Sequence, residues 1–244
     1  MARSRRGSGC LILVVVLVLI LCVVGVIADR VAAHVVESRL ADAVSTNLRE
    51  AGTTAKTTKV DTEGFPFLTQ VLSGKFDGGQ VHLTDVASPQ GSIDKVDLTL
   101  KDVKVPRDVL SGAKPHDVTA AKIVGTGRVS VTEVASRLSL PGLALTNKGS
   151  ALQASFPVDA PIIGSVPVTA DVTPHLTKNT VTFDVANVTA AGVSIPQEVI
   201  SNITEKFARP VALQLPFSVK LDKVTASGGY LNVTGSADNV TLVK

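Results

Sequence analysis

The sequence predicts an α+β protein in which a long N-terminal helix packs on a strongly curved antiparallel β-sheet with short helices, preceded by one transmembrane helix. Three observations support this prediction. An uninterrupted apolar run opens the chain, apolar residues at helical spacing follow it, and most of the remainder is rich in Val and Thr in alternating patterns. With 244 residues, of which 45% are apolar, the chain can bury a sizeable core, most simply as one domain plus an anchor.

The apolar run spans Cys10–Ala28 and is 19 residues long, and about 20 residues are needed to cross a bilayer as a helix. Arg3, Arg5 and Arg6 precede it without any acidic residue, and this bias favours a cytoplasmic N-terminus. The expected layout is a cytoplasmic basic N-terminus (1–9), a single-pass anchor in the cell membrane (10–28) and an extracytoplasmic domain (29–244).

A cleaved signal peptide is the alternative interpretation of the same run. Val26, Ile27 and Ala28 offer a small-residue cleavage site, and cleavage would make the domain a secreted protein. The run is longer than the about 7 to 15 apolar residues that are usual in a signal peptide, so we expect a retained signal anchor. Both cysteines, Cys10 and Cys22, lie inside the run, so no disulfide is expected in the domain beyond it.

Residues 29–51 are expected to form a helix that packs on the sheet. Charged residues lie at other positions of this helix, and Gly52 is a natural helix stop. The polar side of this helix is not predominantly basic, so packing on a sheet is favoured over a position flat on the membrane surface. Its apolar residues recur at steps of four: Val36, Leu40, Val44 and Leu48.

The segment Gly64–Phe76 concentrates aromatic residues, since it holds three of the seven Phe residues in a protein without Trp. Pro66 favours an extended residue before it and a helical turn after it, and Gly74 can end a short helix in the left-handed conformation. Such an apolar cluster either packs into its own domain or contacts an apolar partner. The side chains that share a face at helical spacing are Phe67, Leu68, Val71 and Leu72.

Alternating apolar and polar residues predict strands with one buried face, most clearly at 96–100, 181–185 and 215–221. In several runs the alternation of apolar and polar residues shifts by one position, which we call a phase slip. Such a shift would turn the apolar face outward unless the strand is bulged there. Repeated bulges bend strands, so a strongly curved sheet is expected. Gly228 and Gly229 predict a closing hairpin. The phase slips fall at Leu83–Val86, Leu100–Val103, Val185–Val188 and Leu221–Val224.

Residues 103–112 are similar to residues 193–202, with four identical and three conservative positions. In both copies a strand runs into a Pro at the start of a short helix, where the missing N–H does no harm. We therefore expect two strand–strand–helix units, with chance similarity of Val- and Pro-rich sequence as the alternative.

The run Gly-Phe-Pro-Phe-Leu-Thr-Gln-Val-Leu-Ser-Gly-Lys-Phe at Gly64–Phe76, continued through Asp77–Val86, resembles the signature of the LmeA-like phospholipid-binding family of actinobacterial cell envelopes. The resemblance continues through Leu100–Pro106 and Leu215–Val219 and covers nearly everything after the first helix. It implies an extracytoplasmic lipid-binding domain with a role in building envelope lipids or glycolipids. It provides no catalytic residue to carry over onto this chain.

No pattern of catalytic, cofactor-binding or metal-binding residues emerges from the sequence. The four histidines are far apart, and the motifs of serine hydrolases, zinc proteases and P-loop proteins are missing. We therefore expect no enzyme activity, no cofactor and no metal. The three arginines before the apolar run account for the net charge of +3, because the remaining 21 basic residues equal the 21 acidic ones. A neutral domain is a poor nucleic-acid binder and cannot rely on attraction to anionic headgroups.

The first functional hypothesis is a lipid-binding module. A coiled sheet wrapped on a long helix, as in the tubular lipid-binding (TULIP-like) folds that this pattern resembles, leaves an apolar trough for the acyl chains of a phospholipid or other lipid. The anchor would hold this trough near the outer leaflet of the membrane. The candidate lipid-binding residues at its wall or mouth are Phe65, Phe67, Leu68, Val71, Leu72 and Phe76.

The second hypothesis is a non-catalytic structural or adaptor domain of the cell envelope, with a filled core and a protein partner from envelope biosynthesis. A trough and a core use the same residue types, so composition does not separate the two hypotheses. A glycosyltransferase acting on a lipid-linked sugar is disfavoured, because the sequence has no nucleotide or metal motif.

Overall fold

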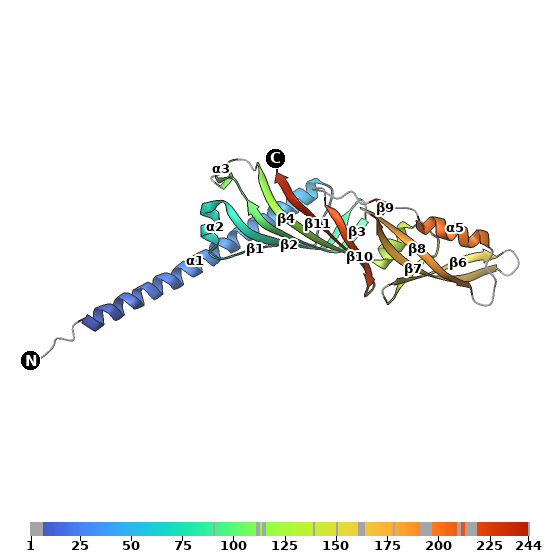
Figure 1. Cartoon of the computed structure of the whole chain (residues 1–244), viewed down its shortest axis with the longest axis horizontal. Helices are drawn as coiled ribbons and strands as arrows, with labels where there is room; N and C mark the ends of the chain where they lie inside the picture. The colour runs from blue at the N-terminus through green and yellow to red at the C-terminus, as the bar shows by residue number, and fades with distance from the viewer. Residues whose placement is uncertain are drawn as a thin grey trace, which may run out of the picture.

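Figure 1 shows the computed structural model, in which a long helix is followed by two antiparallel sheets. The structure describes residues 7–89, 91–110, 113, 116–138, 140–149, 151–160, 164–177, 179–190, 197–208, 211–212 and 219–243. The predicted α+β class is confirmed. The helices are α1 (Gly7–Glu50), α2 (Phe67–Ser73), α3 (Arg107–Leu110), α4 (Val131–Arg137) and α5 (Gln197–Ala208).

The first sheet has the strand order β1-β2-β3-β4-β11-β10, and the second has the order β5-β6-β7-β8-β9. In Figure 1 the second sheet lies at the end of the molecule that is farthest from the N-terminus. The strands are β1 (Thr57–Glu63), β2 (Lys75–Ser88), β3 (Gly91–Lys104), β4 (Val118–Ser130), β5 (Ala144–Lys148), β6 (Ala151–Ala160), β7 (Gly164–Thr177), β8 (Thr180–Ala190), β9 (Val211–Ala212), β10 (Lys220–Ser227) and β11 (Tyr230–Val243).

Helix α1 is continuous from the apolar run into the domain, and its first half projects away from the sheets (Figure 1). Between Leu17 and Ile27 every large apolar side chain is at least 45% exposed. This half is long and apolar enough to cross a membrane. The helix ends as predicted at Gly52, which has a φ of 72°, and the Thr53 N–H donates to the Leu48 carbonyl at 2.8 Å.

The second half of α1 packs along β1, the edge strand of the first sheet. Glu37 Oε1 accepts hydrogen bonds from both the backbone N–H and the hydroxyl of Thr62, each at 2.8 Å. An edge strand presents unpaired backbone groups, and here a helix covers some of them. Ala33 is buried on the same side of the helix. Of the four residues in the predicted stripe, Val36, Val44 and Leu48 are half-buried and Leu40 is exposed.

The first sheet has one apolar and one polar face. Val60, Val81 and Leu98 are register partners across β1, β2 and β3, and the row continues through Gly125 and Gly235. Because side chains alternate along a strand, the next row faces the other side, and it is polar. That row consists of Lys59, His82, Asp97, Thr126 and Thr234.

Irregularities occur at all four predicted phase slips. Asp85, Asp102 and Asn187 have φ angles of 47°, 50° and 52°, and the β10–β11 register shifts between Leu221 and Lys223. Asp and Asn are the residues other than Gly that most readily adopt the left-handed conformation. Each irregularity keeps the apolar side chains on one face, so the strands bend without losing their buried side.

The main core is formed by α4, α5, the second sheet and the β10–β11 hairpin. Leu152, Val172 and Phe207 are fully buried there. Asn179 joins the two sheets, because its Nδ2 donates to the Val219 carbonyl at 2.9 Å and its Oδ1 accepts from the Leu221 N–H at 3.0 Å. The second sheet is therefore fixed to the end strand of the first.

The two predicted strand–strand–helix units are present as β2-β3-α3 and β7-β8-α5. The predicted hairpin at Gly228 and Gly229 joins β10 to β11. Residues 191–196, which carry part of the repeat, and residues 213–218, which carry most of the predicted strand 215–221, lie outside the described residues.

Replacing Asp102 by Val should destabilise the domain by about 1 to 2 kcal/mol, because a β-branched residue is strained in the left-handed conformation. Asp102→Gly should be close to neutral, because Gly adopts this conformation freely. Lys101→Val is the matched control on the neighbouring residue and should cost little, since Val suits a strand. Urea unfolding monitored by circular dichroism measures all three. Equal effects of Val at both positions would contradict the role of the left-handed residue in bending the sheet.

Candidate functional site

The apolar face of the first sheet is incompletely covered. Leu83 on β2 and Ile123 on β4 are buried, but the residues of the strand between them, Val96, Leu98 and Leu100, are only half-buried. A filled core would bury the central strand most completely. The middle of this face is therefore accessible to an apolar ligand.

Two glycines deepen the middle of the apolar face. Gly125 and Gly127 on β4 are the register partners of Leu98 and Val96, so they lie on this face and leave it without side chains there. A Cβ added at Gly125 would lie 3.0 Å from Leu98 Cδ2, whereas one added at Gly127 would meet no atom within 4 Å. Gly127 therefore marks an open place on the floor of the apolar face.

An apolar pocket of about 300 Å³, hereafter the inter-sheet pocket, adjoins this floor. Ligand pockets typically measure about 300–1,000 Å³, so its volume is at the lower end of that range. Val233, which lines it, is the register partner of Gly127. The pocket is lined by Ile93, Val129, Leu231 and Val233 of the first sheet, Val181 and Phe183 of the second, Val134, Arg137 and Leu138 near or on α4, and Ser88, Gly91 and Ser92 of the β2–β3 hairpin.

A polar cluster ties α4 to the β2–β3 hairpin at this pocket. Glu133 accepts hydrogen bonds from the Ser92 hydroxyl at 3.0 Å and from the Ser92 N–H at 3.3 Å, and Arg137 Nε donates to it at 3.1 Å. The hydrogen bonds from Ser92 lower the pKa of Glu133, burial opposes them, and Arg137 lowers it further. Helix α4 itself starts at Ser130, whose hydroxyl accepts from the Glu133 N–H.

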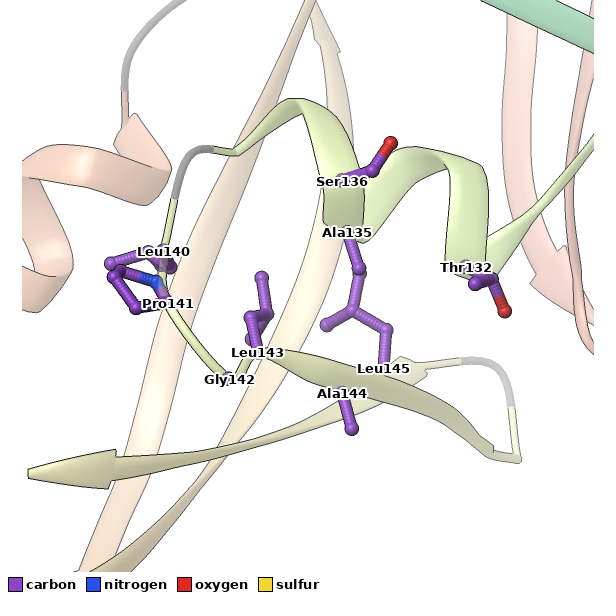
Figure 2. Close-up of a pocket in the computed structure, with 9 residues that line it drawn as sticks. All are labelled: Thr132, Ala135, Ser136, Leu140, Pro141, Gly142, Leu143, Ala144 and Leu145. Carbon is purple, nitrogen blue, oxygen red and sulfur yellow. The ribbon is translucent and has the colours of Figure 1, made fainter.

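A second depression, of about 600 Å³, lies between α4 and the turn that leads into β5 (Figure 2). Its lining comes from residues 132–145 alone, and no strand of the first sheet contributes. Figure 2 shows Leu143 and Leu145 projecting toward α4, while the hydroxyls of Thr132 and Ser136 point away from them. The apolar face and the inter-sheet pocket are the stronger candidate site, because those surfaces are formed by several elements.

The six residues that the sequence singled out separate into two groups. Phe67 is only 2% exposed, and its ring lies 6.0 Å from the ring of Phe76. Val71 and Phe76 are half-buried. Phe65, Leu68 and Leu72 are 52%, 42% and 78% exposed. Helix α2 thus attaches to its domain through Phe67, whereas Leu68 and Leu72 on α2 and Phe65 just before it are exposed to the surroundings.

The attachment of α2 depends on Asp29, the first residue after the apolar run. Its carboxylate accepts hydrogen bonds from the N–H groups of Leu68 at 2.8 Å and Phe67 at 3.0 Å, and Asp29 is only 3% exposed. Pro66, at the N-cap position of α2, makes no side-chain cap, so Asp29 supplies this function from another helix. Arg30 lies over the ring of Phe65, with its guanidinium carbon 5.0 Å from the ring centroid.

The same hydrogen bonds hold the Asp29 carboxylate in its charged form. The bond from the Leu68 N–H lowers the pKa of Asp29 most, burial opposes it, and the Phe67 N–H and the charge of Arg30 lower it further. Sequence reasoning missed Asp29, although it is the first acidic residue of the chain. It also missed the pocket residues, which come from six separate elements.

Charged groups gather on the polar face of the first sheet. His82 Nδ1 lies 2.6 Å from Asp97 Oδ1, and lysines pair with the carboxylates on both sides, Lys95 with Asp97 and Lys59 with Asp61. Among the described residues no group of three or more His, Cys, Asp or Glu side chains could hold a metal ion. These charges lie opposite the apolar face and do not line the candidate site.

Comparison with protein families gives one match. The model of a family described as LmeA-like phospholipid-binding matches residues 27–236, which is most of the chain and includes every residue named above for the site. Comparisons with curated proteins and with solved structures gave no significant match.

Replacing Asp29 by Ala should loosen α2, because two N–H groups lose their acceptor. Hydrogen exchange of the α2 amides should accelerate by roughly five- to tenfold, the size typical of a lost N-cap. Asp42→Ala, an exposed position on the same helix, is the matched control and should leave α2 unchanged. Because the pKa of Asp29 is lowered, wild-type protection should be full above the ordinary aspartate pKa of about 3.9 and be lost as the pH falls through the lower value. Unchanged exchange in Asp29→Ala would contradict the cap.

Proposed function

The chain belongs to the LmeA-like phospholipid-binding family, and from this membership we propose that it is a membrane-anchored extracytoplasmic protein that holds the acyl chains of a phospholipid on the apolar face of its first sheet. The observation that carries the proposal is the open floor at Gly127, which continues into the inter-sheet pocket. The bound lipid would assist the assembly of envelope lipids or glycolipids.

Acyl chains, rather than headgroup charge, supply the affinity in this proposal. Each methylene removed from water contributes about 0.8 kcal/mol, so ten buried methylenes would contribute about 8 kcal/mol before the cost of ordering the chain. The domain has no excess of basic residues. The only charged residue of the inter-sheet pocket, Arg137, is already paired with Glu133. A lipid with any of several headgroups could therefore occupy the site.

The six aromatic and aliphatic residues chosen from the sequence have different roles in this proposal. Phe65, Leu68 and Leu72 are exposed and form a mouth on the side of the anchor. Phe67, Val71 and Phe76 are more buried, and Phe67 and Phe76 connect α2 to the beginning of β2. Phe67 therefore supports lipid binding by holding α2 in place.

Retention of the anchor is part of the same proposal. Helix α1 runs without interruption through Val26, Ile27 and Ala28, and the next residue, Asp29, is fixed by α2. With its basic N-terminus in the cytoplasm, the anchored domain would lie outside the membrane. A lipid-binding family supports a carrier role rather than catalysis, so we assign no catalytic residue.

The substitution Gly127→Phe tests whether the apolar face holds the lipid. Its ring would occupy the open space on the floor. If it displaces about three methylenes, affinity should fall by roughly 50-fold at about 0.8 kcal/mol each. Thr126→Phe is the matched control, because its side chain lies on the opposite, polar face of the same strand. Mass spectrometry of organic extracts from the purified proteins measures the bound phospholipid.

The proposal is supported if extracts of the wild type and of Thr126→Phe contain phospholipid, whereas extracts of Gly127→Phe have lost it at unchanged thermal stability. Equal loading of the three proteins would reject the apolar face as the site. Protein without lipid in every extract would favour the alternative, a structural or adaptor domain with a protein partner.

A further inference from the structure

Three exposed apolar side chains gather beside the membrane end of the domain. Leu68 and Leu72 are four residues apart in α2 and therefore share a face, and Phe65 precedes the helix. We call these three residues the α2 patch. In a soluble domain such a cluster normally contacts a partner.

The structure places the α2 patch directly beside the end of the membrane segment. The Leu68 N–H lies 2.8 Å from the Asp29 carboxylate, and Asp29 follows the last residue of the apolar run. On other sides of α1 the exposed apolar residues continue past that point to Val31 and Val35. The surface at this level is thus apolar on α1 as well as on α2.

The length of the apolar segment puts this level at the edge of the hydrocarbon core. From Cys10 to Ala28 the apolar run has 19 residues, or about 29 Å of helix at 1.5 Å per residue, and the hydrocarbon core of a bilayer is about 30 Å thick. Asp29 and Arg30 therefore lie at the edge of the hydrocarbon core. Arg30 lies over the Phe65 ring at this level. An arginine that extends toward phosphates above an aromatic ring is a common arrangement at membrane interfaces.

From this geometry we propose that the α2 patch inserts into the outer leaflet beside the anchor, and that the bilayer itself covers these three side chains. The inference rests on the proposed retention of the anchor. Two contacts, α1 and the α2 patch, then hold the domain in one orientation against the membrane. Phe67, on the buried side of α2, contacts Phe76 at the start of β2, so the patch brings this end of the apolar face close to membrane lipids.

A single introduced tryptophan tests the insertion, because the natural chain has none. Leu72→Trp in the full-length protein would be reconstituted in nanodiscs of phosphatidylcholine and phosphatidylglycerol with brominated acyl chains. Trp fluorescence should shift to shorter wavelength and be strongly quenched relative to nanodiscs without bromine. Two matched variants serve as controls for this measurement. Val31→Trp reports on α1 at the same level, and Thr173→Trp reports from an exposed position on β7 of the second sheet, which should remain unquenched.

Quenching of Leu72→Trp and Val31→Trp, with none of Thr173→Trp, would support the inference. Quenching of Val31→Trp alone would overturn it while leaving the anchor in place. No quenching of either would overturn both the inference and the retained anchor. Phospholipid measured in extracts of the wild type and Thr173→Trp, purified in detergent before reconstitution, reports separately on lipid carriage, because neither protein changes a residue of the α2 patch or of the apolar face. Quenching of Leu72→Trp combined with no lipid in these two proteins would refute the proposed function alone.

Discussion

The position of α2 against the long helix α1 depends on one carboxylate. Asp29 is the first residue beyond the apolar run, and it accepts the N–H groups of Phe67 and Leu68 at the start of α2. A short helix has little stability of its own, so its position is set by what satisfies its free N–H groups and what its apolar side contacts. Here the Asp29 carboxylate accepts the free N–H groups, and Phe67 makes the apolar contact. The apolar half of α1 and the beginning of the first sheet are therefore connected through rigid structure.

The curvature of the first sheet has an equally local origin. Asp85 and Asp102 adopt the left-handed conformation inside long strands, and each allows the apolar pattern to change phase without changing face. A flat sheet of the same residues would expose half of them after each slip. The bends therefore keep one continuous apolar face, and Gly127 leaves a place in the middle of that face open.

The distribution of charged side chains agrees with a ligand that is held by its hydrocarbon tail. The ladder formed by His82, Asp97 and their lysine neighbours lies on the polar face of the sheet, away from the site. Arg137, at the inter-sheet pocket, is paired with Glu133. Since the charged groups are balanced by one another, the proposed recognition of a lipid relies on the apolar area that it removes from water.

Local patterns in the sequence determined the class of the fold, the continuous helix with its stop at Gly52 and the closing hairpin. They also showed where the strands change phase, and they contain the motif that resembles a lipid-binding family. These features depend on neighbouring residues, and the chemistry of Gly, Pro, Asp and Asn is strong over such short distances. The tertiary structure alone decided which face each residue of α2 presents, since Phe67 and Leu68 are adjacent in sequence but opposite in burial. It also decided the partner of Asp29, nearly forty residues away, and the convergence of separate elements on the inter-sheet pocket. Helical spacing shows that apolar side chains can share a face, but what covers that face depends on segments that are distant in the chain.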